Sequence, residues 1–254
     1  MMRDAGNRGT ASIAIMVEPR PTSSPPTHHS PLWYFERRGL LHGLSERQKQ
    51  EVERHTRMVN VRRGQAVYLP GDSSESVFVV QSGAVKILGK APEGCEVIIA
   101  LLTPGDIFGE LALIADGQAR DHRVEALDDT LLCEVPRPVL VRMIEESPAF
   151  GWHMTKLVGL RLRTLGTRVE ELLGKSAPAR LAHAILEISR QHGIKDDGGV
   201  LIPLRLSQGD LGKLVGLTRE TVNGILQAWR DQRIVDMDRR SIRVHDPERL
   251  RRVR

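Results

Sequence analysis

Cysteine is scarce in this sequence, because the 254 residues include only Cys95 and Cys133. Two thiols this far apart along the chain are too few for a disulfide scaffold or for a metal site of four thiolates. A reducing compartment, the cytoplasm, is therefore expected. A redox role for Cys133 is the alternative, although a thiol on an apolar strand is usually an inert small hydrophobic group.

Long hydrophobic runs and enzyme motifs are also lacking. Near the N-terminus, the longest mostly apolar stretch covers residues 11–17. This is too short to cross a bilayer and lacks a small-residue cleavage site, so we expect no signal peptide and no membrane segment. The chain contains no GxxxxGK(S/T), HExxH or GxSxG motif. These absences argue against a P-loop nucleotide hydrolase, a zinc protease and a serine hydrolase, and we expect no enzyme.

The formal net charge of +5 is unevenly distributed. From Ala177 onward there are 15 Lys and Arg against 10 Asp and Glu, whereas residues 1–176 contain 22 of each. A neutral front and a basic C-terminal third indicate that the last third has a polyanionic partner, of which nucleic acid is the commonest. A solvated charged surface is the alternative.

Residues 1–35 are expected to be a disordered tail. They are rich in Pro, Ser, Thr, Gly and Arg, and the prolines from Pro19 to Pro31 interrupt any regular element. Beyond the tail, Ser45 and Gln48 match the Ser-x-x-Gln pattern of a capping box, which predicts a short helix.

Short β-rich runs separated by glycine turns follow between residues 59 and 135. Such even spacing, with glycine at the corners, indicates an antiparallel sandwich or barrel. We assign residues 36–147 to this β domain. The expected strands are residues 66–69, 76–80, 84–88, 96–100 and 130–135.

A long helix is expected over residues 149–173, within a segment, 148–175, that we assign to dimerisation. Its apolar residues recur every three or four positions, as in a coiled-coil seam. A single stripe flanked by charges suits a seam shared with a second copy of the chain, which predicts a homodimer. The alternative is a helix packed on its own domain. The stripe consists of Met154, Val158, Leu162, Leu165, Val169 and Leu172.

Residues 176–254 form a separate predicted domain. A helix is expected over residues 181–189, a strand over 200–204, and two helices around a turn between 207 and 231. Ser207 and Thr218 suit the N-caps of these two helices, and Gly216 suits the end of the first. This arrangement places a recognition helix in the major groove of DNA. Residues 233–244 then alternate as two strands of a wing.

The exposed start of the second helix carries candidates for DNA contact. Arginine suits the acceptors of guanine and glutamate suits the amino group of cytosine, so Arg219 and Glu220 are candidates for reading bases. The alternative is a solvated first turn in which the helix dipole favours Glu220. Arginines at the wing tip can neutralise phosphate. The expected DNA-binding residues are Ser207, Thr218, Arg219, Glu220, Thr221, Asn223, Arg239 and Arg240.

Two motifs resemble the family of the cyclic-AMP receptor protein and FNR. Residues 217–222, Leu-Thr-Arg-Glu-Thr-Val, are similar to its recognition-helix signature, and residues 104–120 are similar to its phosphate-binding cassette. The likeness covers residues 40–245. It implies an α+β fold with a β-roll of the jelly-roll type, a long dimerisation helix and a C-terminal winged helix-turn-helix. It also implies a transcription regulator that binds a palindromic operator on double-stranded DNA as a homodimer and contacts RNA polymerase.

The cassette implies an effector site in the β-roll. Glycine allows close backbone approach, and the start of a short helix directs N–H groups at an anion. By resemblance, Glu110 would accept from a ribose hydroxyl and Arg120 would hold the phosphate of a cyclic mono- or dinucleotide. The expected effector-binding residues are Gly109, Glu110, Leu111, Ala112, Arg120 and Asp121.

Two alternatives remain open for the β-roll. Glu110 and Arg120 can pair with each other inside an empty roll, which describes an effector-independent regulator. The roll can also be the regulatory module of an enzyme, but residues 177–254 leave no room for a catalytic domain. No metal site is expected, since no cysteine cluster precedes Cys95 and the histidines show no haem signature.

Four positions depart from the family pattern. Asp121 stands where cyclic-AMP receptors have a serine, and its charge would repel the phosphate of a nucleotide. Leu165 and Gly166 replace a pair of hydroxyl residues that grips adenine. Gly224 replaces a second base-reading arginine, and Asn223 beside it is a candidate for reading adenine.

Overall fold

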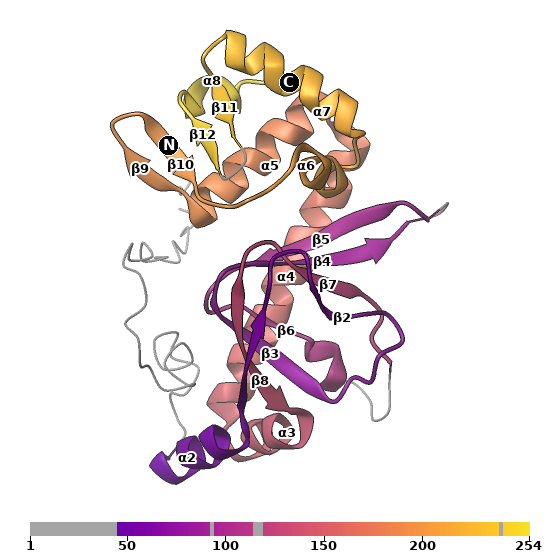
Figure 1. Ribbon diagram of the computed structural model, residues 1–254, viewed down its shortest axis with the longest axis vertical. Coiled ribbons are helices and arrows are strands. Elements are labelled where there is room, and N and C mark those ends of the chain that lie inside the picture. The colour runs from indigo at the N-terminus through magenta and orange to yellow at the C-terminus, as the bar shows by residue number, and fades with distance from the viewer. Residues whose placement is uncertain (1–44, 92–93, 114–118, 239–240) are drawn as a thin grey trace, which may run out of the picture.

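The computed structural model describes residues 45–91, 94–113, 119–238 and 241–254. The expected tail over residues 1–35 and the wing-tip residues Arg239 and Arg240 lie outside these described residues. Figure 1 shows a β domain, a long helix that runs along it, and a C-terminal domain of helices and short strands at one end of that helix. The predicted fold class, a β-roll followed by a long helix and a winged helix-turn-helix, is confirmed.

Two four-stranded antiparallel sheets form the β-roll. Their strand orders are β1-β8-β3-β6 and β2-β7-β4-β5. The short strands β1, β6 and β7 were not among the predicted ones. The strands are β1 (Arg57–Val61), β2 (Ala66–Tyr68), β3 (Ser76–Ser82), β4 (Val85–Lys90), β5 (Glu96–Leu102), β6 (Ile107–Phe108), β7 (Arg123–Ala126) and β8 (Thr130–Pro136).

An apolar core fills the space between the two sheets, because alternate residues of each strand point inward. Val85, Val124 and Leu132 are fully buried there. Gly83 lies at the corner where the chain passes from β3 in one sheet to β4 in the other. Its φ is +80°, and an added Cβ would lie 2.5 Å from the hydroxyl oxygen of Thr130. Only glycine satisfies both conditions.

Helices flank the roll on one side. The first, α2 (Glu46–His55), begins at the predicted capping box: the hydroxyl of Ser45 accepts from the backbone of Gln48, whose side chain accepts from the backbone of Ser45. The helix α3 (Arg137–Glu146) packs against β3, β8 and the short 3-10 helix η2 (Glu110–Leu113). These contacts enclose a second apolar core beneath the β1-β8-β3-β6 sheet.

The long helix α4 (Pro148–Gly174) matches the predicted helix and docks one face on the roll. Phe150 and Met154 are buried in the core with α3. The prediction that Met154 belongs to the dimer stripe is therefore wrong, since its side chain faces its own domain. Farther along this face, the guanidinium of Arg168 donates to the carbonyl oxygen of Ile99 on β5 at 2.7 Å.

The other face of α4 leaves apolar side chains exposed. Leu162 is 69% exposed and Val169 is 56% exposed, and Val158 and Leu172 are also largely uncovered. A row of exposed apolar side chains along one helix is typical of a surface that another protein covers. Most of the predicted stripe is thus free to meet a second copy of the chain.

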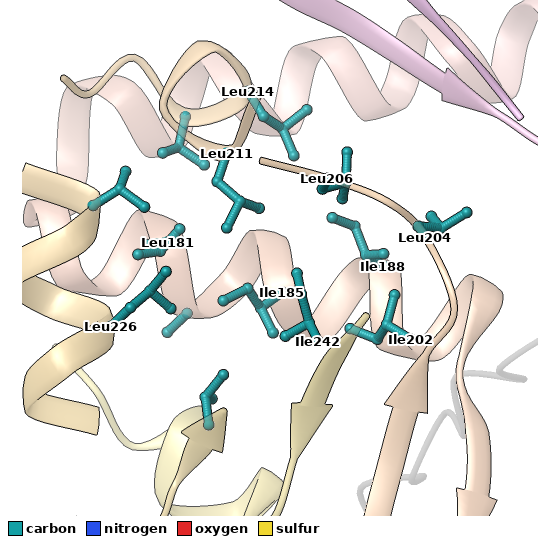
Figure 2. Packing of buried hydrophobic residues seen from close by; sticks show 14 of the residues in the cluster. Leu181, Ile185, Ile188, Ile202, Leu204, Leu206, Leu211, Leu214, Leu226 and Ile242 are labelled. Carbon is teal, nitrogen blue, oxygen red and sulfur yellow. The ribbon is translucent and has the colours of Figure 1, made fainter. Parts of the chain in front are cut away.

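The C-terminal domain packs helices around a small sheet of order β11-β12-β10-β9. Figure 2 shows Leu181 and Ile185 of α5, Leu211 of α6, Leu226 of α7 and Ile242 of β12 gathered in one core. The predicted helix-turn-helix and wing strands are confirmed. The elements are α5 (Ala177–His192), β9 (Ile194–Asp196), β10 (Gly199–Ile202), α6 (Gln208–Val215), α7 (Arg219–Asp231), β11 (Val235–Met237), β12 (Ile242–Val244) and α8 (Pro247–Arg251).

Candidate DNA-binding surface and effector cradle

Both helices of the helix-turn-helix begin at the predicted side-chain caps. The hydroxyl of Ser207 accepts from the backbone N–H of Asp210, and the Asp210 carboxylate accepts from the backbone N–H of Ser207, both at 3.0 Å. Gly216 ends α6 in the left-handed conformation, with φ of +66°. Thr218 caps α7 by accepting from the backbone of Thr221 at 3.2 Å. These local bonds fix where the recognition helix starts and how it leaves the turn.

The first turn of α7 is open. Arg219, Glu220 and Thr221 are exposed, and neither charged side chain has a partner among the described residues. The opposite face of α7 is anchored by Val222 and Trp229, which are buried in the domain core. The helix is therefore rigidly held while its charged first turn remains available to a ligand.

Asn223 and Gly224 follow on the same helix. The side-chain amide of Gln208, at the start of α6, donates to the side-chain oxygen of Asn223 at 3.0 Å. Asn223, the predicted reader of adenine, is thus already oriented from α6, and its amide hydrogens stay free to donate. Nothing lies within 4 Å of a Cβ built on Gly224, which leaves open space beside Asn223.

The wing is fixed to the recognition helix by Arg230. Its guanidinium donates to the carboxylate of Asp236 at 2.8 Å and to the backbone carbonyl of Met237 at 2.9 Å, both on β11. These contacts join the first strand of the wing to the last turn of α7.

In the β-roll, Arg120 is buried at 6% exposure, close to Gly109. Its guanidinium donates to the carbonyl oxygens of Ser76 at 2.6 Å and Gly109 at 3.3 Å. Its Nε has no partner among the described residues. Burial lowers the pKa of Arg120, chiefly by removing water from the charge. Gly109 has a φ of +81°, which favours glycine, and a Cβ there would lie 2.8 Å from this guanidinium, so the absence of a side chain also lets Arg120 approach.

Glu110 does not pair with Arg120, and the alternative that these two residues neutralise each other is wrong. The carboxylate of Glu110 instead pairs with Arg161 of α4 at 2.6 Å. Arg161 also donates to the backbone carbonyl of Ile107 at 2.7 Å. Arg161 of the long helix therefore reaches the cassette and neutralises the carboxylate of Glu110.

Aromatic rings fill the roll beside Arg120. The guanidinium lies 4.3 Å from the ring centroid of Tyr68, and the rings of Phe78 and Phe108 stack at 5.2 Å. Burial raises the pKa of Tyr68 to about 12 despite the nearby charge of Arg120. We call Tyr68, Glu110, Arg120 and Arg161 the effector cradle; with two cations and one anion, it favours an anionic ligand.

The remaining predicted effector residues lie at the edge of the cradle or beneath it. Ala112 is fully buried, and Leu111 is partly exposed. Asp121 is exposed, so its repulsion of an anion is screened by solvent. On α4, Leu165 is half-buried and Gly166 is exposed.

The sequence patterns missed four residues that position these sites: Tyr68, Arg161, Gln208 and Arg230. Only Arg161 carried a usable signal, because it lies seven positions before Arg168 and therefore on the same side of the helix, at the edge of the apolar stripe. Contacts of the other three depend on tertiary packing that no local spacing reveals.

In the ranges that the structure describes, no helix is long and apolar enough to cross a membrane. Within the same ranges, no group of three or more His, Cys, Asp or Glu side chains is arranged to hold a metal ion.

Comparisons with known proteins match both domains of the chain. Residues 58–147 match the model of the cyclic nucleotide-binding domain, and residues 179–253 match that of the Crp-like helix-turn-helix domain. The global nitrogen regulator of Synechococcus elongatus is 31% identical over 192 residues, which cover 74% of this chain and 85% of that protein. A CRP-like cAMP-activated global transcriptional regulator of Mycobacterium tuberculosis is 26% identical over 216 residues, covering 85% and 96%. The structure of FixK2 from Bradyrhizobium japonicum is similar, with a TM-score of 0.66 at 27% identity over 77% of this chain and 95% of that chain.

Fold and sites together define a DNA-binding regulator in which a roll of the cyclic-nucleotide-binding type is joined to a winged helix-turn-helix. The chain belongs to the Crp/Fnr family of transcription regulators. It is a sequence-specific DNA-binding protein of that family, in which homodimers and effector control are typical.

Proposed function

We propose that the protein binds a palindromic operator as a homodimer and reads a G·C pair in each half-site with Arg219 and Glu220. The observation that carries this proposal is the open first turn of α7, where both side chains are exposed on a helix whose other face is buried. A guanidinium matches the two acceptors of guanine, and a carboxylate matches the amino group of cytosine. The two side chains therefore suit the two bases of one pair.

Phosphate contacts would hold the reading helix in register. Ser207, Thr218 and Thr221 lie at helix N-termini, where backbone N–H groups and the helix dipole favour a phosphate oxygen. Arg239 and Arg240 are predicted to neutralise phosphate from the wing without reading sequence. Asn223 would contribute a further base contact beside Arg219.

The exposed stripe on α4 supports the dimer. Two recognition helices related by a two-fold axis enter successive major grooves, so the centres of the half-sites would lie roughly 10 to 11 base pairs apart. A gel-shift assay with genomic fragments tests this proposal. We expect a few fragments that share an inverted repeat to be retained at moderate salt; uniform binding of all fragments would contradict sequence-specific reading.

For the β-roll we propose an anionic effector, with a cyclic mono- or dinucleotide as the first candidate. Support comes from Arg120, which is buried, lacks a carboxylate partner among the described residues and keeps an unpartnered Nε. A buried guanidinium without a carboxylate partner can donate charge-assisted hydrogen bonds to the oxygens of a phosphate. The relative from M. tuberculosis is cAMP-activated by name, which is consistent with this class of ligand.

An effector-independent regulator is the second candidate. Its support is the filling of the roll: Phe78 and Phe108 stack on each other, Tyr68 lies under Arg120, and Arg161 already neutralises Glu110. A bound nucleotide would have to displace Arg161 before a ribose hydroxyl could donate to the Glu110 carboxylate.

Titration calorimetry separates the two candidates. The panel would contain cyclic AMP, cyclic GMP, cyclic di-GMP and inorganic phosphate, with Arg120→Leu as the control variant. Binding that the control loses supports the effector. No binding by any of the four, together with unchanged operator affinity, supports the effector-independent regulator.

The remaining assignments are part of the same proposal. We assign residues 36–147 to the effector domain, 148–175 to dimerisation and 176–254 to DNA binding. Such a regulator acts in the cytoplasm, contacts RNA polymerase when bound near a promoter, and needs no catalytic activity.

A further inference from the structure

The DNA-binding domain and the β-roll share an apolar core. The helix α6 lies beside β5 (Figure 1). Leu88 of β4 and Ile98 of β5 belong to the same buried cluster as Leu211 and Leu214 of α6. The orientation of the DNA-binding domain is therefore set by side chains on both domains, in addition to the chain connection after α4.

A buried lysine lies in this contact. Lys86 of β4 is 8% exposed, and its Nζ lies 2.7 Å from a carboxylate oxygen of Asp210 on α6 and 3.0 Å from one of Glu125 on β7. An ammonium group loses much hydration energy when it is buried, so partners must compensate it. One partner comes from its own domain and the other from the helix-turn-helix.

A second, outer contact connects the same elements. Nζ of Lys213 on α6 lies 2.6 Å from a carboxylate oxygen of Glu96 on β5. Arg123 of β7 lies 3.7 Å from Glu96 and also pairs with Glu125. Six side chains thus alternate in sign in a chain of ion pairs that begins and ends on α6. Because the backbone of α6 joins its two ends, we call this arrangement the ion-pair ring. In order, the ring is Asp210, Lys86, Glu125, Arg123, Glu96 and Lys213.

We propose that Lys86 is a positioning residue for DNA binding, which acts through Asp210 and the ion-pair ring to fix the helix-turn-helix on the β-roll. Asp210 has two tasks, because it also forms the capping box with Ser207 at the start of α6. The β-roll therefore contacts the group that begins the first helix of the DNA-binding motif.

The docked arrangement is suited to DNA binding. Docking engages α6, whereas Arg219 and Glu220 at the start of α7 stay exposed. Two DNA-binding domains held in fixed orientations present their reading helices at one separation, which lowers the entropy lost when a palindrome is bound. A domain released from Lys86 would still bind DNA, but it would match the two half-sites less well.

Lys86 and Asp210 keep their charges near neutral pH. Burial raises the pKa of Asp210, but hydrogen bonds from Lys86 and Ser207 outweigh burial and move the pKa below its ordinary value. Burial likewise lowers the pKa of Lys86, and the hydrogen bonds and charges of Asp210 and Glu125 together outweigh that effect and raise the pKa above its ordinary value. Separating the domains would leave Lys86 or its carboxylate partners without compensation.

The experiment uses the full chain with Lys86→Met, Asp210→Asn, the double variant and Lys86→Arg. Asn keeps an oxygen for the capping box, and Arg keeps the positive charge. Lys90→Met is the matched control, because Lys90 is exposed on the same strand. Hydrogen exchange of α6, β4 and β5 reports docking, while binding to operator and to random-sequence DNA reports function.

The two single variants change net charge in opposite directions. We expect both to lose exchange protection in α6 and β5 while α5 and α7 stay protected, and to lose operator affinity by about tenfold or more. Affinity for random DNA should change by only about twofold. The double variant should be no worse than either single variant, because both remove one interaction. Lys86→Arg and Lys90→Met should behave like the parent.

The inference rests on operator reading by α7, and the two can fail separately. A parent protein that binds all DNA equally would contradict the proposed function, whereas hydrogen exchange would still test docking. Unchanged exchange protection in Lys86→Met and Asp210→Asn would overturn the inference. Lost docking with equal or higher operator affinity would also overturn it, since the ring would then not assist DNA binding.

Discussion

Removal of one exposed leucine from α4 should weaken the dimer by a calculable amount. Leu162 is 69% exposed in the single chain. Full burial of a leucine side chain contributes about 1.5–3 kcal/mol, so coverage of this exposed part by a partner contributes roughly 1–2 kcal/mol. Alanine retains part of that contact, and Leu162→Ala should therefore lose about 1 kcal/mol per protomer.

Because the dimer is symmetric, the substitution counts twice and the loss is about 2 kcal/mol, or roughly a 30-fold larger dissociation constant. Sedimentation equilibrium over a range of concentrations measures this constant. Leu160→Ala is the matched control, since Leu160 is 48% exposed but lies about 200° around the helix from Leu162. Equal dissociation constants for the parent and Leu162→Ala, or equal weakening by the control, would refute the seam.

Three further predictions concern single residues. Asp121→Ser should strengthen cyclic-AMP binding, measured by calorimetry, but only modestly, because Asp121 is exposed and its charge is screened by solvent. An unchanged dissociation constant would show that Asp121 does not exclude cyclic AMP. Burial raises the pKa of the Cys133 thiol to about 11, whereas Cys95 is exposed. A thiol reagent at pH 8 should therefore modify Cys95 in the folded protein and Cys133 only after unfolding. Labelling of both thiols at the same rate in the folded protein would contradict the burial of Cys133. The stability that the Asp210 carboxylate contributes should be present above its ordinary pKa of 3.8 and be lost as the pH falls through the lowered pKa of the folded state. The free energies of unfolding of Asp210→Asn and the parent should therefore converge as the pH falls below 3.8; a difference that stays constant with pH would argue against a role of the charge.

Features set by neighbouring residues could be predicted from the sequence. Ser45 with Gln48, and Ser207 with Asp210, form the expected capping boxes because each pair needs only the geometry of one helical turn. Gly216 ends α6 for the same local reason. The two helices, the wing strands and most of the β-roll follow from such signals together with the periodicity of apolar residues.

Contacts between distant residues could not be predicted in this way. Arg161 and Glu110 are 51 positions apart, and Lys86 and Asp210 are 124 apart. Charge and spacing did not show whether the Glu110 carboxylate would pair with Arg120 or with Arg161 of α4, because an arginine suits a carboxylate equally well in either place. The domain orientation decides the pairing of Lys86, and no local pattern encodes that orientation.

Apolar periodicity gave the correct helix but placed Met154 on the wrong surface. The spacing of Met154 from Val158 is the same as that of Val158 from Leu162, so the pattern cannot separate a residue that faces the dimer from one that faces its own domain. The end of α4 nearest α3 is covered by its own chain, and the stripe becomes free only beyond it.

Selection of binding sites from randomised DNA tests the central claim most directly, using the parent protein, Glu220→Ala and Gly224→Arg. The parent should recover an inverted repeat with one G·C pair fixed in each half-site by Arg219 and Glu220, and Glu220→Ala should relax that position. Nothing lies within 4 Å of a Cβ at Gly224, so the arginine fits and should add a preference for guanine. Identical motifs from all three proteins would contradict base reading by α7.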